Sequence, residues 1–134
     1  MGQLMVRGLR GAITVQNNTA EEILTATSEL LQALVAANDI ERERVASIIF
    51  TTTIDLNAAF PAVAARELGW TDVALLNAHE MAVPGSLPRC VRILIHLNTE
   101  RGPDELRHIY LRDARKLRPD LADQAGGWSS TLEQ

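Results

Sequence analysis

The clearest pattern along the chain is a helical repeat of apolar side chains. Apolar residues recur every three or four positions over Ile23–Val35, which is the spacing of a helix with one face in a core. Thr19 and Glu22 precede this run as a capping box, in which the threonine caps the helix and the glutamate reaches back. Asn38 and Asp39 follow it. The pattern predicts one long amphipathic helix that begins after Thr19 and ends at these last two residues.

Other segments combine apolar and β-branched residues in runs of strand length. The predicted strands are Leu4–Val15 (with irregular spots at Gly8 and Gly11), Val45–Thr53, Asp72–Asn77, Cys90–Leu97 and Arg107–Leu111. The fourth strand alternates little between polar and apolar positions, which is typical of a strand covered on both faces. Between the second and third strands, a proline in the first turn and a final glycine predict a short helix over Phe60–Gly69.

The order of these elements predicts an α/β (α+β) fold, with a mixed five-stranded sheet, one long helix and one short helix. One long amphipathic helix cannot cover both faces of such a sheet. We therefore expect another copy of the chain to cover the remainder, in a homo-oligomer. A single domain is predicted over residues 1–121. Residues 122–134 include paired glycines and paired serines, which predict a flexible C-terminal tail.

Composition and charge narrow the possible partners and the location. A net charge of −4 argues against nonspecific binding of nucleic acid and against an anionic membrane surface. No run approaches the roughly 20 apolar residues of a membrane span, and the first residues do not resemble a signal peptide. The single cysteine, Cys90, excludes an intrachain disulfide and fits a reducing compartment. We expect a cytoplasmic protein that binds neither nucleic acid nor membrane.

Several common kinds of catalytic site are poorly supported by the residues. The three histidines have no metal-binding spacing, and one cysteine cannot complete a metal site. No glycine-rich phosphate loop follows a strand, and Ser86 lacks the sharp turn that activates a serine. Cys90 lies within a predicted strand, where a buried and inert thiol is expected. We therefore expect no metal and no cofactor.

Arginines in and beside the strands are the most informative polar residues. Arg92 lies within an apolar run, so its charge must be paired or bound to something. Arginine holds carboxylates with two hydrogen bonds and keeps its charge when desolvated, which favours a local site for a small anion. Arginine supplies 12 of the 13 basic residues, an excess that codon usage alone can explain, so only the positions carry weight. Glu80 and Tyr110 are further candidates, although a solvated loop acid and a core ring are the simpler interpretations.

Seven segments together resemble a known family, the monofunctional chorismate mutases that form trimeric pseudo-α/β barrels. No single segment is very specific, but all seven occur in order and with the family's spacing over roughly residues 5–121. The segments are Arg7–Val15, Asp55–Ala62, Arg66–Trp70, Glu80–Met81, Cys90–Arg92, Arg107–Leu111 and Leu117–Leu121.

The resemblance implies a reaction, the intramolecular rearrangement of chorismate to prephenate in aromatic amino-acid biosynthesis, at sites between the subunits of a homotrimer. By position, Arg10 and Tyr110 would hold the carboxylate of the enolpyruvyl side chain. Arg92 would lie against the ether oxygen, and Glu80 would accept a hydrogen bond from the ring hydroxyl. Such a rearrangement needs no nucleophile, metal or cofactor, which agrees with the residues that the chain lacks.

The resemblance also implies further contacts with the substrate. Arg66, from across the interface, and Arg118 would favour the ring carboxylate. The remaining substrate-binding residues implied are Phe60, Ala62, Leu75, Leu76, Asn77 and Leu117. The chain departs from the family at two positions, with Val63 in place of a lysine and Asn77 in place of a cysteine. We expect the Asn77 amide to replace the cysteine as a hydrogen-bonding partner of the ring hydroxyl.

Two other functions fit part of the pattern. One is a trimeric barrel enzyme that hydrolyses imines and holds a keto acid with an arginine, but that reaction gives no role to Glu80 and Arg92 together. The other is a catalytically silent module that binds a small dicarboxylate. The sequence leaves this module open, because binding and turnover would use the same arginines.

Overall fold

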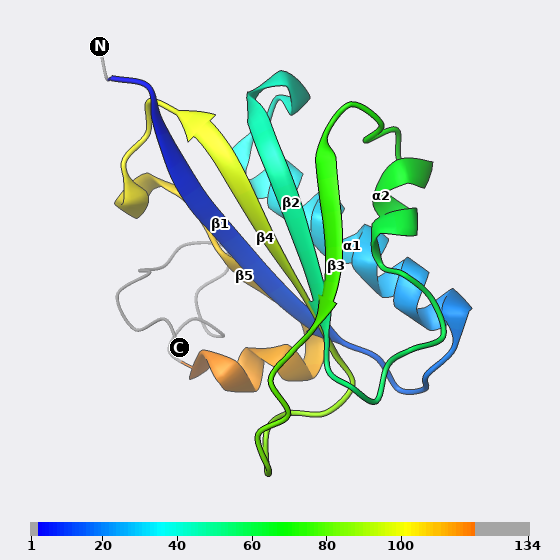
Figure 1. Ribbon diagram of the computed structural model, residues 1–134. Helices are drawn as coiled ribbons and strands as arrows, with labels where there is room; N and C mark the ends of the chain where they lie inside the picture. Colours follow the sequence, from blue (N-terminus) through cyan, green and yellow to red (C-terminus); the bar gives the residue numbers. More distant parts are fainter. Residues whose placement is uncertain (1–2, 120–134) are drawn as a thin grey trace.

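The computed structural model describes residues 3–119 of the chain as one sheet with helices packed against it (Figure 1). The strands are β1 (Met5–Thr14), β2 (Val45–Thr52), β3 (Ala74–His79), β4 (Cys90–Thr99) and β5 (Ile109–Tyr110). The α-helices are α1 (Ala20–Asn38) and α2 (Ala62–Glu67). Three short 3₁₀ helices are η1 (Arg42–Arg44), η2 (Pro103–Glu105) and η3 (Arg112–Leu117).

The sheet is mixed, with the strand order β3-β2-β4-β1-β5. The central strand β4 pairs antiparallel with both β1 and β2, whereas β3 and β5 pair parallel with their neighbours at the two edges. The predicted α+β fold with a mixed five-stranded sheet is therefore confirmed for the described residues.

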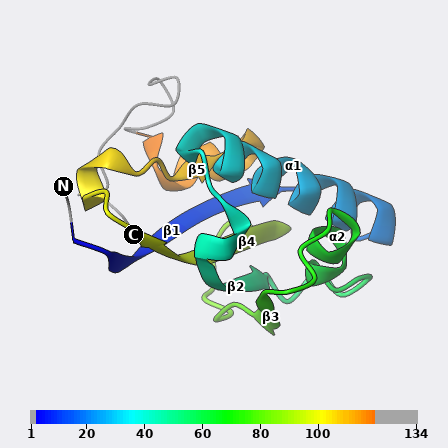
Figure 2. The same ribbon diagram turned by 90° about the horizontal axis from the view of Figure 1, so that it is seen from above.

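The core lies between the sheet and α1, with α2 at its side (Figure 2). Alternate residues of β4, such as Ile93 and Ile95, are buried in this core with β2 and the apolar stripe of α1. The residues between them, such as Arg92 and Leu94, are only half-buried on the opposite face. The sequence predicts that both faces of β4 are covered. Within a single chain, the residues on one face are buried in the core and those on the other are only half-buried. The opposite face is called the open face below.

The ends of α1 follow from local chemistry, as the sequence predicts. The Thr19 hydroxyl accepts a hydrogen bond from the backbone N–H of Glu22 at 3.2 Å. The Glu22 carboxylate reaches back beyond Thr19 and accepts hydrogen bonds from the backbone N–H groups of Gln16 and Asn17. The hydrogen bond from the Asn17 side chain, together with these backbone bonds, lowers the pKa of Glu22. At the other end, Asp39 adopts a left-handed conformation with φ 50°, which ends the helix.

Gly8 and Gly11 do not interrupt β1, so the irregular spots predicted there are wrong. β1 pairs with β4 without interruption, and the only bulge in these ladders lies in β2, between Val45 and Ser47. A Cβ atom on Gly11 would lie 2.7 Å from the carbonyl oxygen of Ile109. Gly11 therefore lets β5 approach β1 closely, which brings Tyr110 beside the open face.

β5 is shorter than predicted, and side-chain hydrogen bonds hold it in place. The buried Asn38, in the last turn of α1, donates to the carbonyl of Arg107 at 2.9 Å. Its Oδ1 accepts from the backbone N–H of Arg107 at 2.7 Å. One amide thus binds both backbone groups of the residue that leads into β5. The predicted tail at residues 122–134 lies outside the described residues.

Candidate active site

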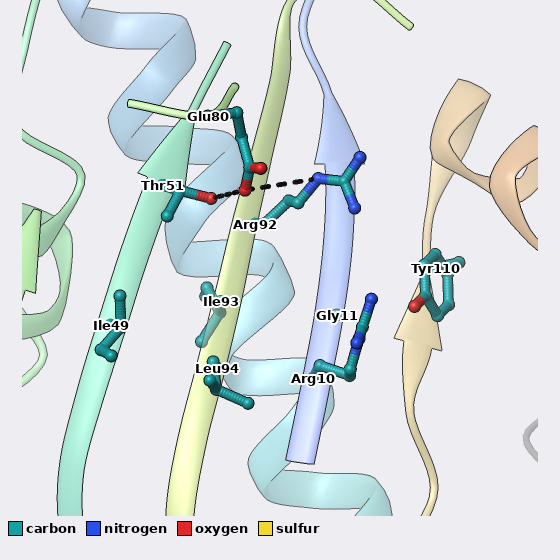
Figure 3. Close-up of a pocket in the computed structure, with 9 residues that line it drawn as sticks. All are labelled: Arg10, Gly11, Ile49, Thr51, Glu80, Arg92, Ile93, Leu94 and Tyr110. Atoms are coloured by element: carbon teal, nitrogen blue, oxygen red, sulfur yellow. Dashed lines mark hydrogen bonds and ion pairs between the residues drawn. The ribbon is translucent and has the colours of Figure 1, made fainter. Parts of the chain in front are cut away.

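A cavity of about 310 Å³ opens on the open face of the sheet, where β1, β2, β4 and β5 meet (Figure 3). This volume lies at the lower end of the range for small-molecule sites. It contains four of the candidate residues from the sequence, one from each of four segments of the chain. The cavity is lined by Arg10, Gly11, Ile49, Thr51, Glu80, Arg92, Ile93, Leu94 and Tyr110.

Strand register explains why the candidates meet. Arg92 of β4 pairs with Ala12 of β1 and with Thr51 of β2, so these three residues form one row across the sheet. Arg10 lies in the next row, paired with Leu94. Because side chains of paired residues share a face, both arginines project from the open face.

Arg92 and Glu80 form a half-buried ion pair. The Glu80 Oε2 atom lies 3.6 Å from Arg92 Nε, and the two side chains are 32% and 30% exposed. Oε2 also accepts a hydrogen bond from the Thr51 hydroxyl. The buried Nε has no hydrogen-bond partner among residues 3–119. In Figure 3, the two terminal nitrogens of Arg92 point away from Glu80, toward β1 and the cavity.

Arg10 and Tyr110 occupy the other end of the cavity. The Tyr110 ring lies beside the Arg10 side chain, with its hydroxyl directed toward β1 (Figure 3). The backbone N–H of Arg10 donates to Nδ1 of the buried His108 at 3.1 Å. Since this N–H can only donate, Nδ1 carries the lone pair and the ring proton belongs on Nε2. This bond connects β1 directly to the residues before β5.

Cys90 lies near Arg92 but is not exposed to the cavity. The thiol is buried, which confirms the expected burial. Burial raises the pKa of the Cys90 thiol to about 11, although the nearby Arg92 guanidinium opposes the shift. The thiol is therefore protonated near neutral pH and is a poor nucleophile.

A second group of candidates lies around the start of α2, away from this cavity. Phe60 is 67% exposed and lines a separate hollow of about 390 Å³ together with Asn77. The Asn77 Oδ1 atom accepts a hydrogen bond from the backbone N–H of Ala62 at 2.9 Å. The Ala62 side chain is fully buried, and Arg66 is exposed near the end of α2.

The remaining candidates are spread over both faces. Leu75 packs against the core, whereas its neighbour Leu76 is exposed on the open face. Leu117 packs in a small cluster with Ala12 and Tyr110, at the end of the open face that η3 covers. Arg118 is buried, with 1% of its surface exposed. Within one chain, the structure therefore brings Arg10, Glu80, Arg92 and Tyr110 together in the cavity. Of the other candidates, Leu117 packs in the same cluster as Tyr110, and none of them lines this cavity.

Several cavity residues were not singled out from the sequence. Thr51 is the most important of them, because its hydroxyl binds Glu80 directly. It stands in a run of three threonines, and only the alternation of β2 shows that Thr51 faces the cavity while Thr52 is buried. Ile49 and Leu94 form the apolar floor, and their sequence signal is the same as that of core residues.

Residues 3–119 contain neither a metal-binding cluster nor a membrane-spanning helix. No group of three or more histidine, cysteine, aspartate or glutamate side chains there could hold a metal ion. Within the same range, no helix has both the length and the apolar character that crossing a membrane requires.

Known proteins resemble the chain over most of its length. The sequence profile of the family described as chorismate mutase type I matches residues 6–121. Chorismate mutase AroH of Thermus thermophilus is 55% identical over 118 residues, which are 87% of this chain and 97% of the relative. Chorismate mutase AroH of Bacillus subtilis (strain 168) is 42% identical over 120 residues, which are 89% of this chain and 94% of the relative.

The solved structures agree with the sequence comparison. A chorismate mutase from Clostridium thermocellum superposes with a TM-score of 0.81 at 47% identity, covering 83% of this chain and 99% of that chain. Sequence profile, relatives and fold all lead to the same result. The chain belongs to the chorismate mutase type I family.

Proposed function

We propose that this chain catalyses its family's reaction, the rearrangement of chorismate to prephenate, at the cavity on the open face. The observation that carries the proposal is the convergence of Arg92, Glu80, Arg10 and Tyr110 from distant segments into one cavity. Arg92 stabilises the ether oxygen, and Glu80 accepts a hydrogen bond from the ring hydroxyl. Arg10 and Tyr110 hold the enolpyruvyl carboxylate.

The chemistry of the rearrangement matches what these residues offer. The flexible substrate must fold until its two reacting carbons meet, and a clamp on a carboxylate removes that entropy before the reaction. As the ether bond stretches, negative charge grows on its oxygen. A fixed guanidinium in a largely apolar cavity stabilises that charge more in the transition state than in the bound substrate. No proton transfer or covalent intermediate is needed.

The active unit that we propose is a homotrimer in the form of a pseudo-α/β barrel, with a site at each subunit interface. Phe60 and Asn77 line one hollow of the chain, and Arg92 lines another. Asn77 pairs with the buried Phe50, so it lies on the opposite face of the sheet from Arg92. We infer that one small substrate contacts both groups only when they come from different copies. The exposed apolar residues on the open face support this assembly, because Leu76 and Val6 are 58% and 60% exposed in the single chain.

Asn77 has two roles in this proposal. Its Oδ1 accepts the backbone N–H of Ala62 at the start of α2. Its NH₂ group then remains to donate a hydrogen bond to the ring hydroxyl of the substrate held by a neighbouring copy. Arg66 and Arg118 are the proposed partners of the ring carboxylate. A cytoplasmic location, inferred from the single cysteine, stays a prediction.

The test is a direct assay that follows loss of the conjugated-diene absorbance of chorismate. We expect rapid conversion to prephenate, and Arg92→Ala should lower kcat by at least roughly 10²–10³-fold, by analogy with lost oxyanion donors. Arg92→Lys should rescue poorly, because a lysine cannot make a planar two-point contact.

Arg44→Ala is the matched control, since Arg44 is exposed beside Glu41 on η1 and should keep full activity. Binding of chorismate without turnover, in a folded oligomer, would contradict the proposal and favour a dicarboxylate-binding module.

A further inference from the structure

Two hydrogen bonds to β2 hold Glu80 in place, one through its backbone and one through its side chain. Its backbone N–H donates to the carbonyl of Thr52 at 2.8 Å, and its side-chain Oε2 accepts from the hydroxyl of Thr51. Glu80 follows β3 directly, at the start of the irregular segment that leads to β4. These two bonds therefore attach Glu80 to the sheet, although it lies beyond the end of β3.

We propose that Thr51 is a positioning residue for the reaction: its hydroxyl holds the Glu80 carboxylate toward the substrate and prevents its closure onto Arg92. This inference rests on the function proposed above. Thr51 itself acts only through Glu80, so it is not a catalytic residue.

The distance between the two charged groups carries the inference. A charge-assisted N–H···O bond normally measures about 2.7–2.9 Å between heavy atoms. Glu80 Oε2 stops at 3.6 Å from Arg92 Nε, and that buried nitrogen has no hydrogen-bond partner among the described residues. The Thr51 hydroxyl binds the same Oε2 from the β2 side, so it holds this oxygen away from Arg92.

The direction of the Arg92 side chain indicates why its distance from Glu80 matters for the reaction. Its terminal nitrogens point toward β1 and the cavity rather than toward Glu80 (Figure 3). A carboxylate that closed onto the guanidinium would neutralise part of its charge before the ether oxygen could use it. Because that charge acts mainly in the transition state, loss of the Thr51 bond should lower kcat more than it raises KM.

Thr51→Val is the main test, because valine keeps the branched shape of threonine and removes only the hydroxyl. We expect kcat to fall about tenfold or more, the loss that corresponds to one hydrogen bond to a charged group, with KM changed by less than about threefold. Thr51→Ser keeps a hydroxyl and should restore most of kcat. Ser47→Ala is the matched control, since Ser47 lies on the same face of β2 and binds His96 instead, at 2.8 Å.

A double-mutant cycle separates positioning from a general effect on the fold. In a Glu80→Gln background, Thr51→Val should change kcat by less than about twofold, since the group on which it acts has lost its charge. Equal losses with and without Glu80 would overturn the inference. So would a raised KM at unchanged kcat, or a failure of Thr51→Ser to restore activity.

A crystal structure of the Thr51→Val variant makes the test independent of activity. We expect Glu80 Oε2 to move closer to Arg92 Nε than the present 3.6 Å. If Arg92→Ala removes activity but Thr51→Val leaves kcat and this distance unchanged, the inference fails and the proposed site stands. If Arg92→Ala and Glu80→Gln both keep full activity, the proposed site itself is wrong.

Discussion

At the scale of single residues, the chain places charge where strands usually carry apolar side chains. Arg92 alternates with the buried Val91 and Ile93, and its side chain is 30% exposed. A guanidinium in that position keeps its charge under partial desolvation, where a lysine would lose its proton more readily. The position of the residue in the strand therefore matters as much as its type.

Cys90 allows a prediction about stability and pH. Its folded pKa of about 11 exceeds the ordinary value of 9.0, so the folded chain keeps the proton over a pH range in which the unfolded chain loses it. The thiol's contribution to the free energy of unfolding is fully present below about pH 9 and is lost as the pH rises toward 11. The loss is on the order of 2 to 3 kcal/mol.

Urea unfolding of the wild type and of Cys90→Ala at several alkaline pH values checks this effect. The wild type should lose the additional stability and the variant should not, whereas parallel curves would contradict the assignment. A thiol reagent at pH 8 should leave Cys90 unmodified in the folded protein and react with it once the chain is unfolded.

Residue type alone predicts part of the site. Arg92 stands out in the sequence as a charge in an apolar run, and Glu80 as a charge in a segment otherwise short of charge. Their proximity, and the bond from Thr51 to Glu80, depend on β2 lying between β3 and β4, which no local pattern encodes. A threonine within a predicted strand is ordinary, so its role appears only in three dimensions.

At the scale of elements, local signals predict the ends of α1 and fail for β5. The helix begins after Thr19 and ends at Asp39 as its caps predict, because both caps are made by neighbouring residues. The strand predicted over Arg107–Leu111 is only two residues long, since its position depends on contacts far away in the sequence. The 3₁₀ helix η3 was not predicted at all.

The two hydrogen bonds between Asn38 and Arg107 lead to a prediction about how β5 is held in place. Asn38→Ala removes the amide that binds both backbone groups of Arg107, so we expect the free energy of unfolding to fall by about 1 to 3 kcal/mol. KM for chorismate should also rise, because Tyr110 lies on the strand that the amide holds. Urea unfolding and steady-state kinetics measure the two effects. Gln32→Ala on the exposed side of α1 is the control, and an equal effect there would contradict the prediction.

At the scale of the whole molecule, the apolar pattern predicts an uncovered sheet face but not the symmetry that covers it. The single chain leaves Leu76, Val6 and other large apolar residues exposed, as the order of elements in the sequence predicts. The predicted number of copies rests on the family resemblance alone, because an exposed face does not encode a rotation axis.

Mixing two inactive variants tests whether each site is shared between subunits. Arg92→Ala and Arg66→Ala should each be nearly inactive alone. When both are unfolded together and refolded at equal concentrations, the proposed arrangement gives every mixed trimer one site with both arginines. About a quarter of the wild-type activity should therefore return, by the statistics of random cyclic assembly. No recovery in mixed trimers confirmed by mass spectrometry would place both residues in the same chain's site.

The alternation of β1 and β4 has a consequence for how genes of this kind can change. Inserting or deleting one residue within either strand would turn its later side chains over, so that Arg10 or Arg92 would face the buried core. Most single substitutions in these strands alter only one contact. Evolution can therefore change the amino acids of these two strands more freely than their length. A change in length would alter which face each later side chain occupies.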